Sequence, residues 1–198
     1  MNNKIGKKLK ENSNDIIYTP KPVAELMISL CEIKENEIVL DPCRGGGVFY
    51  DNLPNNCIKK YCEIEEGIDF LEFNEKVDLI IGNPPYSIWN KWIEHTIKLN
   101  PKKICYIMNS FNLTDKRVLY LMENGYNISK FHILKIEWFF GHSFIVIFEK
   151  NINSIFSVSS KRFYCDLCNN KCNRGLKGND PNKCNPIIKK KTNNKKSL

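Results

Sequence analysis

Short runs of apolar residues alternate along the chain with stretches in which apolar residues recur every three or four positions. The runs are typical of buried strands and lie at 37–41, 58–63, 77–81 and 103–108. The helical spacing covers 23–31, 89–99 and 113–123. Strands that alternate with helices predict an α/β fold with a parallel sheet covered on both faces.

Two more apolar ranges, 131–139 and 144–149, flank Gly141 and predict an antiparallel strand pair at one edge of the sheet. Beyond them the composition becomes polar and basic. We therefore expect five parts: a flexible N-terminus at 1–15, a main domain at 16–150, a linker at 151–160, a cysteine segment at 161–186 and a basic disordered tail at 187–198.

The charge of this 198-residue chain is unevenly distributed. The formal net charge is +8, yet residues 1–150 carry 19 Lys and Arg against 20 Asp and Glu, whereas residues 151–198 carry 11 against 2. Such a basic segment predicts a polyanionic partner, nucleic acid first, although a solvated lysine-rich tail is the alternative. The polar, basic start of the chain has no apolar leader, which predicts an intracellular protein.

Four of the nine cysteines crowd into the basic segment, in the pattern C-x2-C-x3-C-x11-C. This spacing fits a structural zinc site held by Cys165, Cys168, Cys172 and Cys184, and the segment has too few apolar residues to fold without such a link. Unrelated reduced cysteines are the alternative. Lysines and arginines interleave here with Phe163 and Tyr164, a combination suited to single-stranded or flipped-out nucleic acid.

A glycine cluster, Gly45 to Gly47, follows the first predicted strand and its terminal Asp41. Glycines at this position permit a sharp turn into a helix and a close approach of the backbone to a ligand. Glu63 ends the next strand 22 residues after Asp41, where nucleotide sites place an acid that bonds the ribose hydroxyls. Together they indicate an adenosine-containing cofactor, whereas the glycines alone fit a plain turn. Asp69 is a candidate contact of the adenine amino group, or else a helix N-cap.

The tetrapeptide Asn83-Pro84-Pro85-Tyr86 follows the third predicted strand and so lies at the carboxyl edge of the sheet, where ligands of open α/β sheets bind. Neither proline can donate a hydrogen bond. The segment therefore presents two acceptors, the Asn83 side-chain oxygen and the Pro84 carbonyl, beside an aromatic ring. Two acceptors can hold an exocyclic amine while Tyr86 stacks on the base that carries it.

These motifs, in this order, resemble those of the adenine-N6 DNA methyltransferases that use S-adenosylmethionine, most of all their gamma group. The resemblance covers residues 16–150 and begins with Tyr18-Thr19-Pro20. It implies a Rossmann-like class I methyltransferase sheet and a catalytic Asn83-Pro84-Pro85-Tyr86. It also implies that the cofactor is bound by Thr19, Pro20, Asp41, Pro42, Gly45, Gly47, Glu63, Asp69 and Phe70.

The family also has an aromatic residue near the last strand pair that stacks on the flipped base, and Phe139, then Phe140, matches it best; a place in the core is the alternative for both. The chain departs from the family at Arg44, which replaces a small residue in the cofactor loop. The short spacing from Glu63 to Asp69 predicts that the helix between the second and third strands is reduced or absent. We expect no large target-recognition domain within these 198 residues.

The resemblance implies direct transfer of a methyl group to adenine N6 in nucleic acid, with DNA preferred to RNA. RNA remains an alternative because a small core with a zinc knuckle also suits RNA targets. Protein glutamine methylation is a second alternative, since the side-chain amide nitrogen, like adenine N6, has a delocalised lone pair and is a poor nucleophile. A non-enzymatic binding module on an inert methyltransferase fold is the third.

The cysteine spacing makes a direct prediction about metal content. Elemental analysis of protein purified without chelator is expected to give one zinc per chain, because the segment lacks an apolar core and metal supplies its order. Removing the metal is expected to disorder residues 161–186 and to leave the 16–150 domain folded. Protein that contains no zinc would contradict the assignment.

Overall fold

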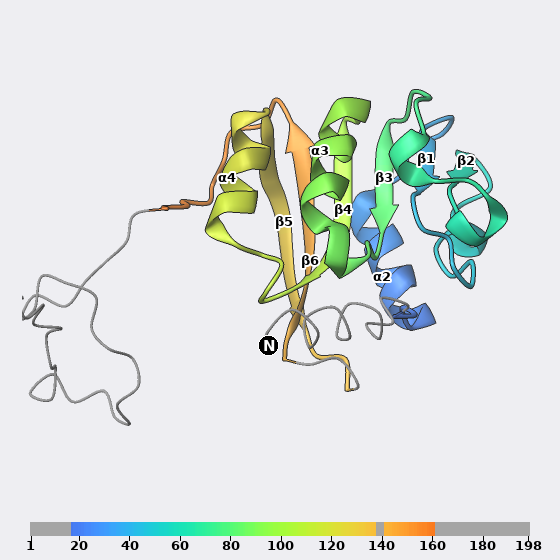
Figure 1. Ribbon diagram of the computed structural model, residues 1–198, viewed down its shortest axis with the longest axis horizontal. Coiled ribbons are helices and arrows are strands. Elements are labelled where there is room, and N and C mark those ends of the chain that lie inside the picture. Colours follow the sequence, from blue (N-terminus) through green and yellow to red (C-terminus); the bar gives the residue numbers. More distant parts are fainter. Residues whose placement is uncertain (1–16, 138–140, 161–198) are drawn as a thin grey trace, which may run out of the picture. The chain divides into compact units, whose positions relative to one another are not determined.

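The computed structural model describes residues 17–137 and 141–160, and every structural statement below refers to them. Six strands form one sheet in the order β2-β1-β3-β4-β6-β5 (Figure 1). The first four strands are parallel and β6 is antiparallel to both its neighbours, so the predicted sheet and edge pair are confirmed. The strands are β1 (Ile38–Asp41), β2 (Ile58–Tyr61), β3 (Leu79–Gly82), β4 (Lys103–Asn109), β5 (Tyr126–Leu134) and β6 (Ser143–Lys150).

In the described part of the chain, three α-helices cover the two faces of the sheet. Successive residues of β3 point to opposite faces: Leu79 joins the core cluster under α2 (Lys21–Cys31), and Ile80 joins the cluster under α3 (Trp89–Leu99) and α4 (Asp115–Glu123). Both faces are therefore buried, as the continuous apolar runs predicted. None of the described helices is long and apolar enough to cross a membrane.

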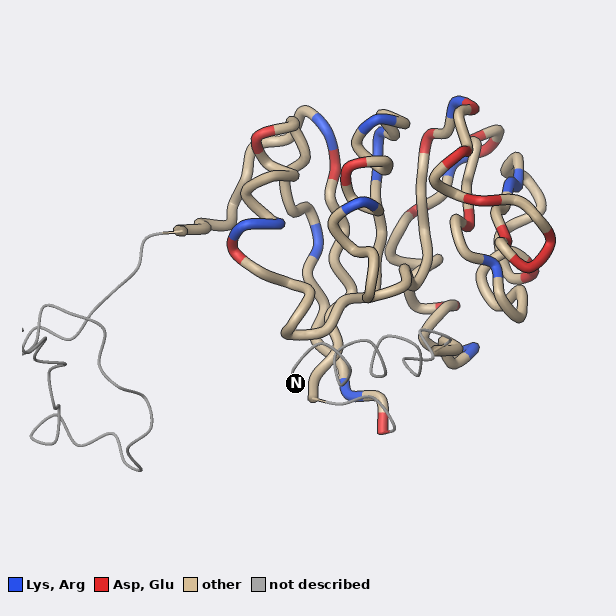
Figure 2. The backbone as a smooth tube through the Cα atoms, viewed as in Figure 1, with Lys and Arg blue, Asp and Glu red and all other residues tan. Residues whose placement is uncertain are grey.

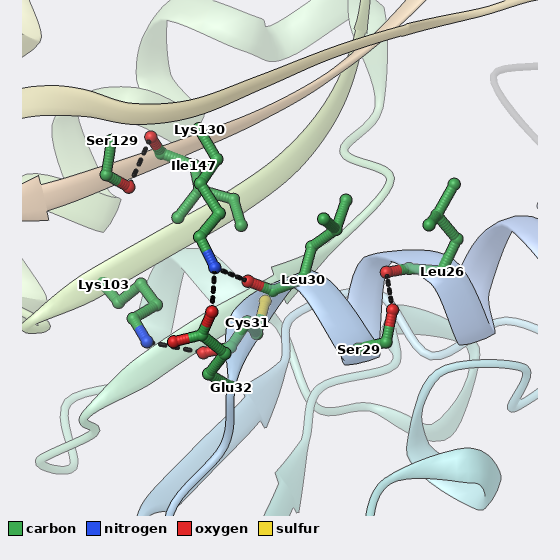
Figure 3. A network of polar contacts seen from close by, with 9 residues as sticks. All are labelled: Leu26, Ser29, Leu30, Cys31, Glu32, Lys103, Ser129, Lys130 and Ile147. Atoms are coloured by element: carbon green, nitrogen blue, oxygen red, sulfur yellow. Dashed lines mark hydrogen bonds and ion pairs between the residues drawn. The ribbon is translucent and has the colours of Figure 1, made fainter.

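Two lysines hold the C-terminal end of α2 against the sheet (Figure 3). The Lys130 ammonium donates to the Leu30 carbonyl at 2.8 Å and pairs with the Glu32 carboxylate at 2.5 Å, while Lys103 donates to the Cys31 carbonyl at 2.5 Å. The last carbonyls of a helix have no partner within it, and cations there also complement the helix dipole. The anchored helix has its N-terminal end directly after Thr19 and Pro20.

The connection after the glycine cluster differs from the prediction. Instead of a helix, only a 3₁₀ turn, η1 (Tyr50–Asn52), follows. The Asn52 side chain donates to the Val48 carbonyl at 2.9 Å, and Pro54 lacks the N–H that another helical turn requires. The last strand pair also begins earlier than predicted, since β5 starts at Tyr126, three residues after α4 ends at Glu123.

Residues 151–160, predicted as a linker, contain no helix or strand but lie against the main body. Phe156 and Val158 are partly buried against the core cluster of α3 and α4. The Asn127 side chain donates to the Ile152 carbonyl at 2.7 Å. The residues predicted to form the zinc segment and the basic tail follow, and they lie outside the described range.

Candidate active site

A pocket of about 420 Å³ lies at the carboxyl ends of β1, β2 and β3. Parallel strands end at the same edge, so the loops that follow them converge on one place. Residues that the sequence assigned to the cofactor and to catalysis meet there from four separate segments. Those that line the pocket are Thr19, Pro42, Gly45, Glu63, Asp69, Phe70, Asn83 and Pro85.

The Glu63 carboxylate joins the glycine loop to the turn that follows β2. One of its oxygens accepts from the Gly45 backbone N–H at 2.5 Å, and the other accepts from the Glu65 N–H at 3.2 Å. Each carboxylate oxygen retains a further lone pair for a ligand hydroxyl. The path of the loop requires a glycine at position 47. Gly47 has φ +81°, which side chains disfavour, and a Cβ there would come 2.7 Å from an oxygen of Asp51.

Asp41 does not line the pocket, although the sequence placed it among the cofactor contacts. Its side chain is fully buried and accepts from the backbone N–H groups of Cys43 and Tyr50, each at 3.3 Å. Burial raises the pKa of Asp41 to about 7, and the charge of Glu63 acts in the same direction. Asp41 thus binds the backbone on both sides of the glycines from the buried side of the loop. Pro20 and Gly47 also lie outside the pocket lining.

Arg44, the departure from the family pattern, links the glycine loop to β2. Its guanidinium lies 5.3 Å from the ring centre of Tyr50 and 4.8 Å from that of Tyr61, and it donates to Glu66 at 3.1 Å. Its backbone N–H donates to the Cys62 carbonyl at 2.9 Å. A small residue could not make these side-chain contacts, which sequence reasoning did not foresee.

The turn from Glu63 to Asp69 is as short as predicted. It consists of a 3₁₀ turn, η2 (Ile64–Glu66), closed by one antiparallel bridge between Glu63 and Ile68. Asp69 caps the next 3₁₀ turn, with an oxygen accepting from the Leu71 N–H at 2.9 Å, and also lines the pocket. Ile64 and Ile68 line the pocket with exposed apolar side chains, 72% and 39% accessible. Neither isoleucine was predicted as a site residue, although apolar residues within an acidic turn are a usable signal.

Asn83 presents a buried acceptor to the pocket. Its amide nitrogen donates to the Ile17 carbonyl at 3.0 Å, and its Oδ1 has no hydrogen-bond partner among the described residues. Because the Ile17 carbonyl can only accept, the amide must turn its NH₂ group toward it, which leaves Oδ1 for a ligand. The Thr19 hydroxyl is likewise buried without a partner in the described range. Unsatisfied buried polar atoms are costly, so both sites fit a bound polar ligand.

Contacts with Trp89 and Cys43 hold the tetrapeptide in place. Pro84 and Tyr86 do not line the pocket. The Tyr86 ring is partly buried against Trp89, with ring centres 6.1 Å apart at 64°. The Cys43 thiol donates to the Asn83 carbonyl at 3.2 Å, and burial raises the pKa of this thiol well above its usual value. Cys43 is therefore a neutral structural donor and not a nucleophile.

Six of the predicted site residues lie outside the described range: Phe139, Phe140, Cys165, Cys168, Cys172 and Cys184. Within residues 17–137 and 141–160, no cluster of three or more His, Cys, Asp or Glu side chains is arranged to hold a metal. The zinc site and the second base-stacking ring thus remain predictions.

No protein-family model and no curated protein matches the sequence. Solved structures do match the fold. A dimethyladenosine transferase from Plasmodium falciparum superposes with a TM-score of 0.53 at 16% identity, covering 69% of this chain and 63% of that one. The 23S rRNA methyltransferase ErmE gives 0.53 at 10% identity, covering 72% of each chain.

TrmN from Thermus thermophilus gives a TM-score of 0.51 at 14% identity over 66% of this chain, which spans about half (48%) of the TrmN structure. One further matched methyltransferase structure contains bound SAM. At these identities the likeness establishes the fold alone. The main body of the chain has the Rossmann-like fold of methyltransferases.

Proposed function

We propose that this protein transfers a methyl group from S-adenosylmethionine to the N6 amine of adenine in nucleic acid. The observation that carries the proposal is the buried Oδ1 of Asn83, a residue that lines the pocket, because this oxygen has no hydrogen-bond partner among the described residues. The amine of adenine is a poor nucleophile because its lone pair is delocalised into the ring. An oxygen that accepts one of its hydrogens favours a pyramidal nitrogen and stabilises the positive charge that develops during transfer.

The pocket supports S-adenosylmethionine as the methyl donor, whose sulfonium makes the methyl group transferable. Glu63 has lone pairs for the ribose hydroxyls, and the Thr19 hydroxyl has no hydrogen-bond partner among the described residues. Ile64 and Ile68 offer apolar surface for a flat base. At about 420 Å³, the pocket has the volume typical of small-molecule sites.

The transfer needs few groups from the protein. Asn83 Oδ1 and the Pro84 carbonyl accept the two hydrogens of the amine, while Tyr86 stacks on the base. The N6–carbon bond forms as the sulfur–carbon bond breaks, and the methylated amine then loses one proton to water. Holding the amine in line with the methyl group is the main contribution of the site.

The polymer is DNA in the main proposal because the glycine and Asn-Pro-Pro-Tyr motifs resemble the DNA enzymes. RNA is the second candidate, favoured by two of the matched structures, a 23S rRNA methyltransferase and a dimethyladenosine transferase. A protein glutamine substrate would use the same acceptors. Labelled S-adenosylmethionine offered with DNA, RNA and protein separates the three, and label in N6-methyladenine identifies the product.

Asn83→Ala is expected to abolish transfer in this assay and to leave the affinity for S-adenosylmethionine within about tenfold, because the lost oxygen serves the target amine. Calorimetry measures the affinity. Asn74→Ala, which changes an exposed asparagine ahead of β3, is the matched control and is expected to retain full activity. If Asn83→Ala instead loses cofactor affinity as severely as activity, Asn83 has been given the wrong role.

We also propose that residues 161–198 provide affinity for nucleic acid without reading its sequence, through phosphate contacts and a zinc-stabilised knuckle at Cys165, Cys168, Cys172 and Cys184. The support is the charge of the sequence, since all 11 Lys and Arg beyond residue 150 fall in this range. By contrast, residues 63–75 of the main body carry six acids and no Lys or Arg, visible as red segments in Figure 2.

Replacing Lys189, Lys190 and Lys191 with Gln is expected to reduce the slope of log affinity against log salt. Each lost phosphate contact removes about 0.9 from the slope on duplex and about 0.7 on single strands. The control replaces Lys34, Lys76 and Lys98, exposed lysines at the amino edge of the sheet. Equal slopes for both triple variants would show that the tail does not contact phosphates.

A further inference from the structure

Phe111 is the only exposed phenylalanine in the part of the chain that the structure describes, with 66% of its side chain accessible. It lies in the loop between β4 and α4. Gly82 of β3 is opposite Tyr106 of the neighbouring parallel strand β4, and Asn83 follows Gly82 directly. The loop that carries Phe111 and the catalytic tetrapeptide therefore leave the sheet at the same edge.

Hydrogen bonds from both sides hold the Phe111 loop in place. Asn109 Oδ1 accepts from the backbone N–H groups of Phe111 and Asn112, each at 3.0 Å. From α4, the Arg117 guanidinium donates to the Phe111 carbonyl at 3.4 Å, and to the carbonyl and side-chain oxygen of Asn112 at 3.2 and 3.0 Å. The backbone of the loop is thus fixed while its aromatic side chain is exposed.

The same arginine ties this loop to the catalytic segment. Arg117 Nε donates at 2.9 Å to the side-chain oxygen of Asn90, the second residue of α3. Helix α3 begins three residues after Tyr86, and Trp89 at its start packs against the Tyr86 ring. A continuous set of contacts therefore connects the Phe111 loop with the tetrapeptide that holds the target amine.

The charges around the site favour an approach of nucleic acid from the Phe111 side. Residues of the range 63–70 line the β2 side of the pocket. Of the six acids in the stretch 63–75, Glu66 and Glu75 pair with Arg44 and Lys60, and the other four have no ion pair among the described residues, so this side repels phosphates. On the β4 side, Lys91 and Lys116 are exposed, and Arg117 forms no ion pair with a described carboxylate. The parts of α3 and α4 nearest this edge, residues 89–94 and 115–117, carry two acids, Glu94 and Asp115, against these three cations. A polyanion therefore meets net positive charge at this side.

We infer that Phe111 contacts the substrate, stacking on a base of the nucleic acid other than the target adenine, whose two faces are left to Tyr86 and to Phe139 or Phe140. The inference rests on the proposed function and adds to it a residue that binds nucleic acid and not the cofactor, since Phe111 does not line the cofactor pocket. Stacking needs a flat aromatic face and tolerates a change of ring. Arg117 is then a positioning residue that acts through the loop.

The test uses the full chain and an adenine-rich random-sequence oligonucleotide pool, prepared both as DNA and as RNA. Phe111→Ala and Phe111→Leu are each expected to lower kcat/KM for the pool by about 5- to 150-fold, the range for stacking one base on one ring. Phe111→Tyr and Phe111→Trp keep an aromatic face and are expected to stay within about threefold of the wild type. The melting temperature and the affinity for S-adenosylmethionine are expected to stay unchanged in all four.

Ile58→Ala is the matched control, because Ile58 is also exposed, at 48%, but lies at the amino edge of the sheet. Wild-type rates for Phe111→Ala and Phe111→Leu overturn the inference and leave the proposed function intact. Loss of activity that Phe111→Tyr and Phe111→Trp do not restore also overturns it. If the wild-type protein methylates neither pool, the proposed function fails and this inference fails with it.

Discussion

The Glu63 carboxylate is the contact on which the proposed site depends. It accepts from the backbone of Gly45 and of Glu65 at once, and so fixes the glycine loop to the turn that follows β2. An ordinary Rossmann-like unit places a helix after the glycines, whereas here η1 is a single short turn. With so little regular structure on this side, side-chain contacts must hold the loop. Glu63, the buried Asp41 and the Arg44 guanidinium share that task.

On the opposite side of the site, packing and hydrogen bonds hold Asn83 in place. Asn83 directly follows β3, which is buried on both faces. Its side-chain nitrogen donates to the Ile17 carbonyl, and its backbone carbonyl accepts from the Cys43 thiol. These contacts leave Oδ1 as the one atom of the amide without a described partner. An acceptor fixed in advance costs little reorganisation when charge develops on the substrate, which is the property that an amine methyltransferase requires.

The sequence predicted the sheet well because its strands are buried on both faces and form continuous apolar runs, as at Val77 to Ile81. It also placed Glu63 and Asn83 at the pocket, since parallel strands bring their carboxyl ends together. The sequence did not predict those roles that depend on contacts between residues distant along the chain. Asp41 ends β1 as expected, yet it binds the loop from beneath. Ile17 and Arg117 carry no motif, and their roles depend on bonds to residues distant in the sequence.

Calorimetric titration with S-adenosylmethionine tests the central claim most directly, since the account requires that Glu63 bind the cofactor as well as the glycine loop. Glu63→Gln is expected to weaken binding by about 1.5–3 kcal/mol, roughly 10- to 150-fold, through loss of a charged hydrogen bond. Glu72→Gln removes an exposed carboxylate outside the pocket lining and is expected to bind like the wild type. Equal affinity of Glu63→Gln and the wild type, or no binding by the wild type, would contradict the account.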